Sequence, residues 1–348
     1  MRISSREEVK GVTDLNRPAV SLYSGLLLIF QSLLVHLVGG SVGREGVGIQ
    51  LGAWAARWAE APRWYRAGCI ATGISVVFGA PVTATAFIFE TALVQKKRFD
   101  WKEILAVPLM AIGADLIVRA IGVRHFPFPQ YELSTLQQLL NFKSLIVVSV
   151  FVVLVTAHSA LFLIASSWVS SKVPGLSDRN LVVRATLFLV VFMAAALFFG
   201  DKSGLTGLGA QSWSWLYMND SPAIAIGPAL LLLAFLKVAF TAGFSGFGFK
   251  GGEVTPMLAV GSFLGVFLST IPMVSTPIVS VIGFSAVWGV SARRPLVAAA
   301  LGYECFGGAA VFAGAITYLS LKVGDAIFQS SLMKNDKVRD AWHRGLYD

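Results

Sequence analysis

Two glutamates lie beside glycines at the edges of strongly apolar stretches, and their surroundings could bind an anion and carry a proton. Glu45 lies in Gly43-Arg-Glu-Gly46, and Glu253 lies in Gly251-Gly-Glu-Val-Thr-Pro256. The glycines free the backbone and Pro256 suits a first helical turn, so each segment predicts a helix that begins beside its glutamate. A helix N-terminus carries free amide N–H groups and a positive dipole end, and it therefore favours a carboxylate or a bound anion.

A glutamate at such a helix start can occupy the place of the anion itself and leave it when protonated. We predict this gating role for Glu45, and a second helix start at Glu253, where the Thr255 hydroxyl adds a donor. The simpler interpretation is that both glutamates only cap their helices. An acid within an otherwise apolar span is costly to keep, which favours the functional interpretation.

The composition indicates which elements must position these residues. The 348-residue chain is 55% hydrophobic and only 14% charged, with a mean hydropathy of +0.71. Soluble domains are about 45–50% apolar and about 25% charged, so the chain is predicted to be an all-α polytopic membrane protein. Apolar segments are predicted at about 19–43, 46–59, 64–79, 82–95, 102–122, 143–169, 181–199, 223–246, 254–271, 276–290, 295–320 and 316–328.

Several of these segments are shorter than the ~20 residues that span a bilayer, and many break at glycine or proline. Broken helices are tolerated in a membrane where the freed backbone lines a protein cavity, so the breaks predict a transport site. The formal charge of +9 comes from Lys and Arg that flank the apolar runs, as expected near lipid headgroups rather than nucleic acid.

Other chemistries find no support in the residue pattern. The two cysteines, Cys69 and Cys305, lie in apolar stretches, and the four histidines are not paired at ligand spacing. We therefore predict no disulfide framework, no metal site and no cofactor. No Ser/His, Cys/His or paired-carboxylate arrangement is placed for hydrolysis, so the chain is not expected to be an enzyme.

The chain also contains an internal repeat. Pro81–Glu90 aligns with Pro295–Glu304: proline opens each segment, glutamate follows nine residues later, and a Gly-Glu break precedes each. Two halves with broken helices are the plan of many transporters, whose site lies at the repeat interface. The predicted organisation is a polar N-terminal segment 1–18, a first repeat 19–135, a second repeat 136–331 and a basic tail 332–348. Residues 143–253 precede the second Gly-Glu break but only 1–44 precede the first, so we expect a truncated first repeat.

Three separated segments resemble one family. GREGVGIQLG, at 43–52, resembles the GREGPxxQ signature of the CLC chloride channel and transporter family. Phe78-Gly-Ala-Pro81 with Phe89-Glu90 resembles its FNAP…FxxE segment. The segment GFKGGEVTP, at 248–256, departs from the chloride pattern GxFxP and looks like the fluoride/proton antiporter branch, CLC-F, as do 257–261, 304–307 and 316–320. The resemblance covers roughly residues 20–331.

The resemblance implies a CLC-type inverted-repeat fold with short, broken, tilted helices and a homodimer in which each subunit forms one pathway. It places Glu45 at the external gating glutamate, and Glu253 and Thr255 at the central Glu and Thr of fluoride and proton coupling. Phe328 falls at the central Tyr of the family and lacks its hydroxyl. The family's loop before the GREG segment has no counterpart here, which agrees with a truncated first repeat. The implied anion-binding residues are Gly43, Arg44, Gly46, Gly252, Val254, Thr255 and Phe328.

Three functions stay open at this point. The leading one is fluoride export coupled to proton import in the plasma membrane, with fluoride or chloride, protons and lipids as partners. The second is chloride conduction or transport of the voltage-gated chloride channel type, against which the GGEVTP segment speaks. The third is a truncated, non-transporting protein that dimerises with intact relatives.

Five further polar residues lie within apolar segments. Asp115 and Arg119 are four residues apart and are expected to pair on one helix face. Lys237 either adds positive potential to an anion route or snorkels to the interface. Glu90 and Glu304 recur at equivalent places of the repeat, which suits a structural role as well as a functional one.

Overall fold

The computed structural model describes most of the chain as helix. The described residues are 22–57, 62–123, 127–132, 142–172, 179–200, 203–209, 216, 227–249, 251–270, 276–329 and 336–344. The helices in these ranges are α2 (Leu22–Leu37), α3 (Glu45–Arg57), α4 (Arg63–Phe78), α5 (Pro81–Val94), α6 (Trp101–Ala120), α7 (Phe142–Lys172), α8 (Arg179–Phe199), α10 (Gly227–Gly246), α11 (Val254–Ser269), α12 (Thr276–Ala292), α13 (Pro295–Phe306), the short 3₁₀ helix η4 (Gly308–Val311), α14 (Phe312–Gln329) and α15 (Asp336–Arg344). The predicted all-α polytopic fold is confirmed.

The apolar helices differ in length. In the described part of the chain, four helical stretches are long and apolar enough to cross a membrane: Leu145–Lys172, Val182–Phe199, Gly227–Gly246 and Gly308–Gln329. Helices α5, α11 and α13 are apolar but shorter, as the broken pattern predicted. Leu197 and Phe198 of α8 are 78% and 83% exposed, as suits side chains that face lipid.

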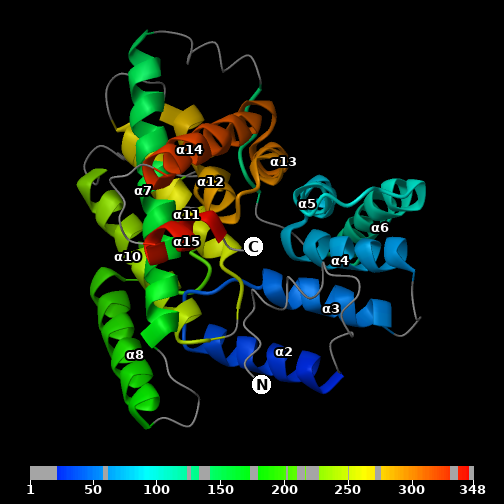
Figure 1. The fold of residues 1–348 in the computed structure, drawn as a ribbon, viewed down its shortest axis with the longest axis horizontal. Coiled ribbons are helices and arrows are strands. Elements are labelled where there is room, and N and C mark those ends of the chain that lie inside the picture. The colour runs from blue at the N-terminus through cyan, green and yellow to red at the C-terminus, as the bar shows by residue number, and fades with distance from the viewer. Residues whose placement is uncertain are drawn as a thin grey trace.

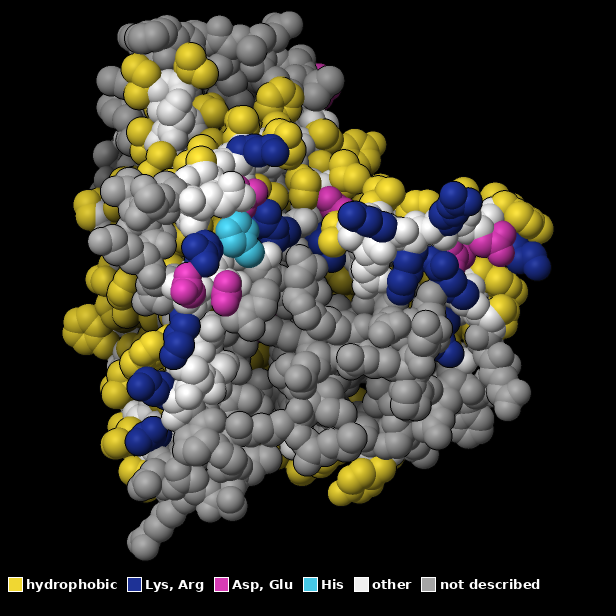
Figure 2. Space-filling view, viewed as in Figure 1, with side chains coloured by type: hydrophobic (Ala, Val, Ile, Leu, Met, Phe, Trp, Pro, Cys, Tyr) yellow, Lys and Arg dark blue, Asp and Glu magenta, His cyan; other side chains and the backbone are white. Residues whose placement is uncertain are grey.

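The helices form two groups that meet at the middle of the molecule. Figure 1 shows α2 to α6 on one side and the helices from α7 onward on the other, with α5 and α13 facing each other between them. Helix α11 is the innermost element: it packs against α10 and α12, and nearly all of its residues are buried. Figure 2 shows hydrophobic side chains along the edges of the molecule and Lys and Arg gathered across one face.

The predicted apolar segment over 295–320 is not one continuous helix. Helix α13 ends at Phe306, and Gly307 follows with φ +85°, a conformation that glycine adopts without strain. The segment at 127–132 satisfies the backbone groups that the break frees: the Tyr131 amide donates to the Phe306 carbonyl at 2.6 Å, and the Ala309 amide donates to the Tyr131 carbonyl at 3.2 Å. The break between α13 and η4 is therefore stabilised by backbone hydrogen bonds to the segment at 127–132.

The two segments that align in sequence lie against each other in space. The Glu90 carboxylate, from α5, accepts the amides of Leu296 and Val297 at 3.1 and 2.9 Å, at the start of α13. The Glu304 carboxylate, from α13, accepts amides at the start of α5 in return. Each acid neutralises the free N–H groups of the opposite helix.

Candidate anion and proton site

The two Gly-Glu segments meet, although more than two hundred residues separate them. The Gly43 amide donates to the Gly252 carbonyl at 2.5 Å, and the Gly252 amide donates to the Gly43 carbonyl at 2.6 Å. This reciprocal antiparallel bridge holds the start of α3 against the start of α11. The sequence-predicted residues Gly43, Glu45 and Gly252 are therefore brought together.

The Glu45 carboxylate lies at the N-terminus of a helix other than its own. Glu45 is the first residue of α3 and is 2% exposed. Its Oε1 atom accepts the backbone amide of Thr255, in the first turn of α11, at 2.8 Å. A buried carboxyl group thus occupies the position that the free amides and dipole of α11 make favourable for an anion.

Two glycines lie directly against this carboxylate. A Cβ atom at Gly43 would lie 1.8 Å from Glu45 Oε2, and a Cβ atom at Gly252 would lie 2.0 Å from the same atom. A Cβ atom at Gly46 would make only ordinary contacts, the nearest at 3.8 Å from the Gly252 amide nitrogen. The two bridging glycines therefore leave the space that the Glu45 carboxylate fills.

Glu253 has a different environment from Glu45. It is the N-cap residue of α11, but its side chain makes no capping hydrogen bond there. The carboxylate instead accepts the hydroxyl of Ser245, near the end of α10, and is 6% exposed. Simple capping of its own helix therefore does not account for Glu253. Ser245 carried no signal in the sequence, where one serine among apolar residues and glycines is unremarkable.

Two cavities adjoin the site. One of about 720 Å³ is lined by Arg44 and Thr255 among other residues. Arg119 is a second cation of this lining, and it pairs with Asp115 at 2.7 Å, as the spacing predicted. The other cavity is about 20 Å³ and adjoins Glu45 and Val254. Of the predicted site residues, Arg44 and Thr255 therefore line the roomy cavity, whose lining also includes the acid Glu304, and Glu45 and Val254 line the small one.

Phe328 lies apart from this arrangement in the described structure. It is buried in α14 and stacks on the Trp342 ring of α15, with ring centroids 4.9 Å apart. It contributes to the lining of neither cavity described above. Its role in anion binding stays a prediction.

Lys237 is a buried cation held by backbone carbonyls. It is fully buried in α10, and its Nζ atom donates to the carbonyls of Leu205 and Gly207 at 3.1 and 2.8 Å. The Gly207 amide in turn donates to the Gly39 carbonyl at 2.7 Å, in the connection between α2 and α3. The snorkelling interpretation of Lys237 is therefore wrong, because its amine points into the protein.

The fold and the site define an α-helical membrane protein in which two helix starts surround a buried carboxylate. The chain matches the family model described as voltage gated chloride channel over residues 2–321, and it therefore belongs to that family. It is 28% identical over 295 residues to the chloride/fluoride channel protein of Pseudomonas syringae pv. tomato, which covers 81% of this chain and 62% of that protein. It is 26% identical over 362 aligned residues to the H(+)/Cl(-) exchange transporter ClcA of Vibrio campbellii, covering 95% of this chain and 75% of that one.

Two solved structures share the fold. A slow cyanobacterial Cl⁻/H⁺ antiporter aligns with a TM-score of 0.73 and 20% identity, covering 97% of this chain and 81% of that chain. A CLC-type fluoride/proton antiporter aligns with a TM-score of 0.71 and 23% identity, covering 93% of this chain and 80% of that chain. The predicted CLC membership is confirmed.

Proposed function

We propose that this chain exchanges an anion for protons across a membrane and that Glu45 is the gate. The observation that carries the proposal is the buried Glu45 carboxylate at the start of α11, bound by the Thr255 amide at 2.8 Å. A carboxylate in that position is a tethered anion, and a free anion suits the same helix terminus for the same electrostatic reason.

Exchange follows from competition for this one position. While Glu45 is ionised, its charge keeps it at the N-terminus of α11. When Glu45 takes up a proton it becomes neutral, its attraction to the helix dipole falls, and an anion can replace it. Release of the proton restores the charge and displaces the anion. One proton and the anion therefore alternate at the site, which is the basis of coupled transport.

Fluoride is the anion that we propose for export. It is small and strongly hydrated, so its site must replace lost water with several close donors. The amides of the first turn of α11 and the Thr255 hydroxyl are such donors, and the GGEVTP segment resembles the fluoride branch. The Pseudomonas relative carries fluoride in its name, and one of the similar structures is a fluoride/proton antiporter.

Chloride exchange is the second candidate. The Vibrio relative is named for chloride exchange, and the cyanobacterial structure is that of a Cl⁻/H⁺ antiporter. The two candidates share the Glu45 gate and differ only in the anion that replaces it.

The working unit is proposed to be a homodimer in the plasma membrane. Helices α6, α13 and α14 carry large apolar side chains on the outside, including Ile117 at 65%, Leu296 at 57% and Tyr318 at 53% exposed. The resemblance to the CLC family implies a dimer surface formed by segments 82–122 and 295–320, which contain α6, α13 and the first half of α14. Single-molecule subunit counting in lipid vesicles at low protein density tests this state. Dimers are expected, whereas monomers would show that lipid alone covers these faces.

Fluoride efflux from liposomes tests the proposed function. Vesicles that contain the 348-residue chain are loaded with fluoride or with chloride, and an electrode follows each anion while a pH dye follows protons. Fluoride efflux accompanied by proton uptake supports the leading proposal, and faster coupled chloride efflux supports the second candidate. Folded protein that moves neither anion contradicts both, and it is the result expected of the non-transporting alternative.

A further inference from the structure

Six cationic side chains gather where helices α4 and α6 begin and α5 ends. None of them is buried, and they are Arg63, Arg66, Lys96, Lys97, Arg98 and Lys102. The Arg63 guanidinium pairs with Glu103 at 2.6 Å, which joins the start of α4 to the start of α6. Figure 2 shows Lys and Arg gathered over the side of the molecule that α4, α5 and α6 form in Figure 1. We call these six residues the basic corner.

Two acids of the same region do not neutralise the basic corner. Glu103 pairs with Arg63, and Asp100 accepts the Lys102 amide as the N-cap residue of α6. The six cations exceed these two acids by four charges. Lys96, Arg98 and Lys102 form no ion pair with any other described residue. The basic corner therefore presents a net positive charge to its surroundings.

Lys96 occupies a backbone position that usually belongs to glycine. Its φ is +54°, and the Lys96 and Lys97 amides donate to the carbonyls of Leu93 and Ala92, each at 2.9 Å. This pair of bonds closes a helix through one left-handed residue, which is most often glycine because a Cβ atom is unfavourable there. The chain thus carries a cation at this turn at a steric cost that glycine would avoid.

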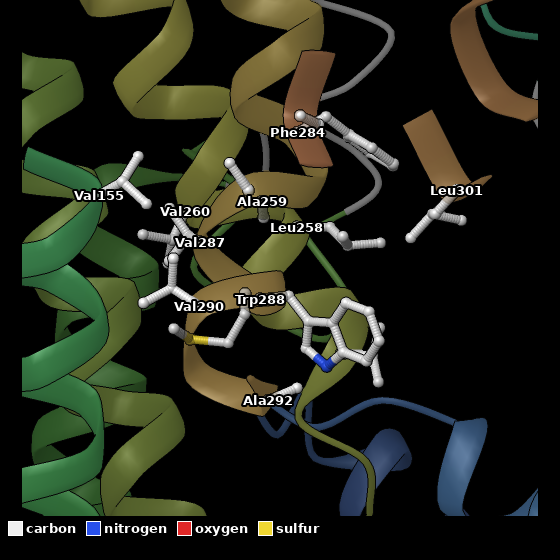
Figure 3. Close-up of a cluster of buried hydrophobic side chains, with 14 of the residues drawn as sticks. Val155, Leu258, Ala259, Val260, Phe284, Val287, Trp288, Val290, Ala292 and Leu301 are labelled. Carbon is white, nitrogen blue, oxygen red and sulfur yellow. The ribbon is translucent and has the colours of Figure 1, made fainter. Parts of the chain in front are cut away.

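The basic corner borders exposed apolar side chains. Leu93 and Val94, at the end of α5, are 55% and 45% exposed, and Trp101, at the start of α6, is 65% exposed. Lys102 Nζ lies 5.8 Å from the centroid of the Trp101 ring. Tryptophan beside lysine is typical of the level of lipid headgroups, where apolar surface meets the acyl chains and charge meets water. Figure 3 shows the opposite arrangement beside α11 and α12, where buried hydrophobic side chains pack together.

We propose that the basic corner binds the phosphate group of an anionic phospholipid, whose acyl chains lie against Leu93, Val94 and Trp101. Lys and Arg form strong, charge-assisted hydrogen bonds to phosphate oxygens, and basic clusters beside membrane helices attract anionic lipid. A phospholipid matches both the charge and the apolar border, whereas a free phosphate ion matches only the charge. The proposal does not depend on the proposed function, because it involves neither the transported anion nor Glu45.

Lipid binding to the purified full-length chain tests the proposal. The protein in neutral detergent at low salt is titrated with phosphatidylglycerol or with phosphatidylcholine, and native mass spectrometry counts the bound lipids. Phosphatidylglycerol should bind more tightly. The combined variant Lys96→Gln, Arg98→Gln and Lys102→Gln should bind it at least about ten-fold more weakly, because each Lys or Arg near an anionic surface strengthens binding roughly five-fold.

The matched control removes three exposed cations elsewhere. It combines Lys172→Gln, Arg184→Gln and Lys322→Gln, on α7, α8 and α14, and should keep the wild-type affinity for phosphatidylglycerol. An equal loss in this control would overturn the basic corner, since it would show that charge over the whole protein attracts the lipid. Equal binding of the two lipids would also overturn it. So would inorganic phosphate that displaces phosphatidylglycerol at equal concentration, because the site would then take a free anion.

Lys96→Gly separates lipid binding from folding. Glycine relieves the steric cost of the φ of +54°, so the unfolding temperature without added lipid should rise, while the affinity for phosphatidylglycerol should fall several-fold with the lost charge. A purely structural role of Lys96 would not give these opposite effects. Unchanged affinity for phosphatidylglycerol in Lys96→Gly would contradict the role of Lys96 in the basic corner.

Discussion

Glu90 and Glu304 cap each other's helices. Glu90, near the end of α5, binds the first amides of α13, and Glu304, near the end of α13, binds the first amides of α5. The same reciprocity recurs in the bridge between Gly43 and Gly252, which joins the starts of α3 and α11. Reciprocal contacts thus join α5 to α13 and the start of α3 to the start of α11.

The first prediction concerns the Glu304 cap. Its carboxylate accepts the amides of Val82 and Thr83 at 2.7 and 2.6 Å and also the Thr83 hydroxyl. Glu304→Ala leaves these donors without an acceptor in an apolar surrounding, so we expect a loss of roughly 1–3 kcal/mol in the free energy of unfolding. Glu304→Gln keeps one acceptor oxygen and should lose less. Thermal unfolding in detergent measures both, and equal stability of Glu304→Ala and wild type would contradict the cap.

The second prediction concerns the space that Gly252 leaves. The Cβ atom in Gly252→Ala would lie 2.0 Å from Glu45 Oε2, so the flexible carboxylate must move away from α11. We expect an anion flux that is less tightly coupled to protons while the protein stays folded. The control is Gly113→Ala, since a Cβ atom at Gly113 of α6 meets nothing within 4 Å. Coupling of wild-type strength in Gly252→Ala would show that the carboxylate does not need this space.

The third prediction concerns the buried amine of Lys237. Lys237→Met keeps the length of the side chain but leaves the Leu205 and Gly207 carbonyls without their donor. Hydrogen bonds to charged groups are worth about 1.5–3 kcal/mol, so the unfolding temperature should fall clearly. Limited proteolysis of the connection at 203–209 should also become faster. If Lys237→Met resists heat and protease to the same extent as the wild-type protein, Lys237 does not anchor this connection.

The sequence predicted the helix starts at 45 and 254 correctly because glycine and proline mark them chemically. It did not predict the break at Gly307, because a glycine in a glycine-rich membrane segment looks like a packing residue until its φ of +85° is seen. The repeat singled out Glu90 and Glu304, but alignment shows equivalence and not contact.

The fourth prediction concerns the charge of Glu45. Glu45→Gln preserves the size of the side chain and removes the group that takes up and releases protons. Since the neutral amide cannot alternate between a charged and an uncharged state, anion flux in this variant should continue without proton movement. Glu103→Gln is the matched control. Glu103 is also buried, but it lies outside the site and pairs with Arg63 at a distance of 2.6 Å.

Simultaneous recording of anion efflux and proton uptake in liposomes with Glu45→Gln tests the central claim most directly. The gate predicts anion efflux with proton uptake reduced to the background of protein-free vesicles, while Glu103→Gln keeps the wild-type ratio. Proton uptake that still accompanies anion efflux in Glu45→Gln, at the wild-type ratio, would contradict the role of Glu45 as the gate.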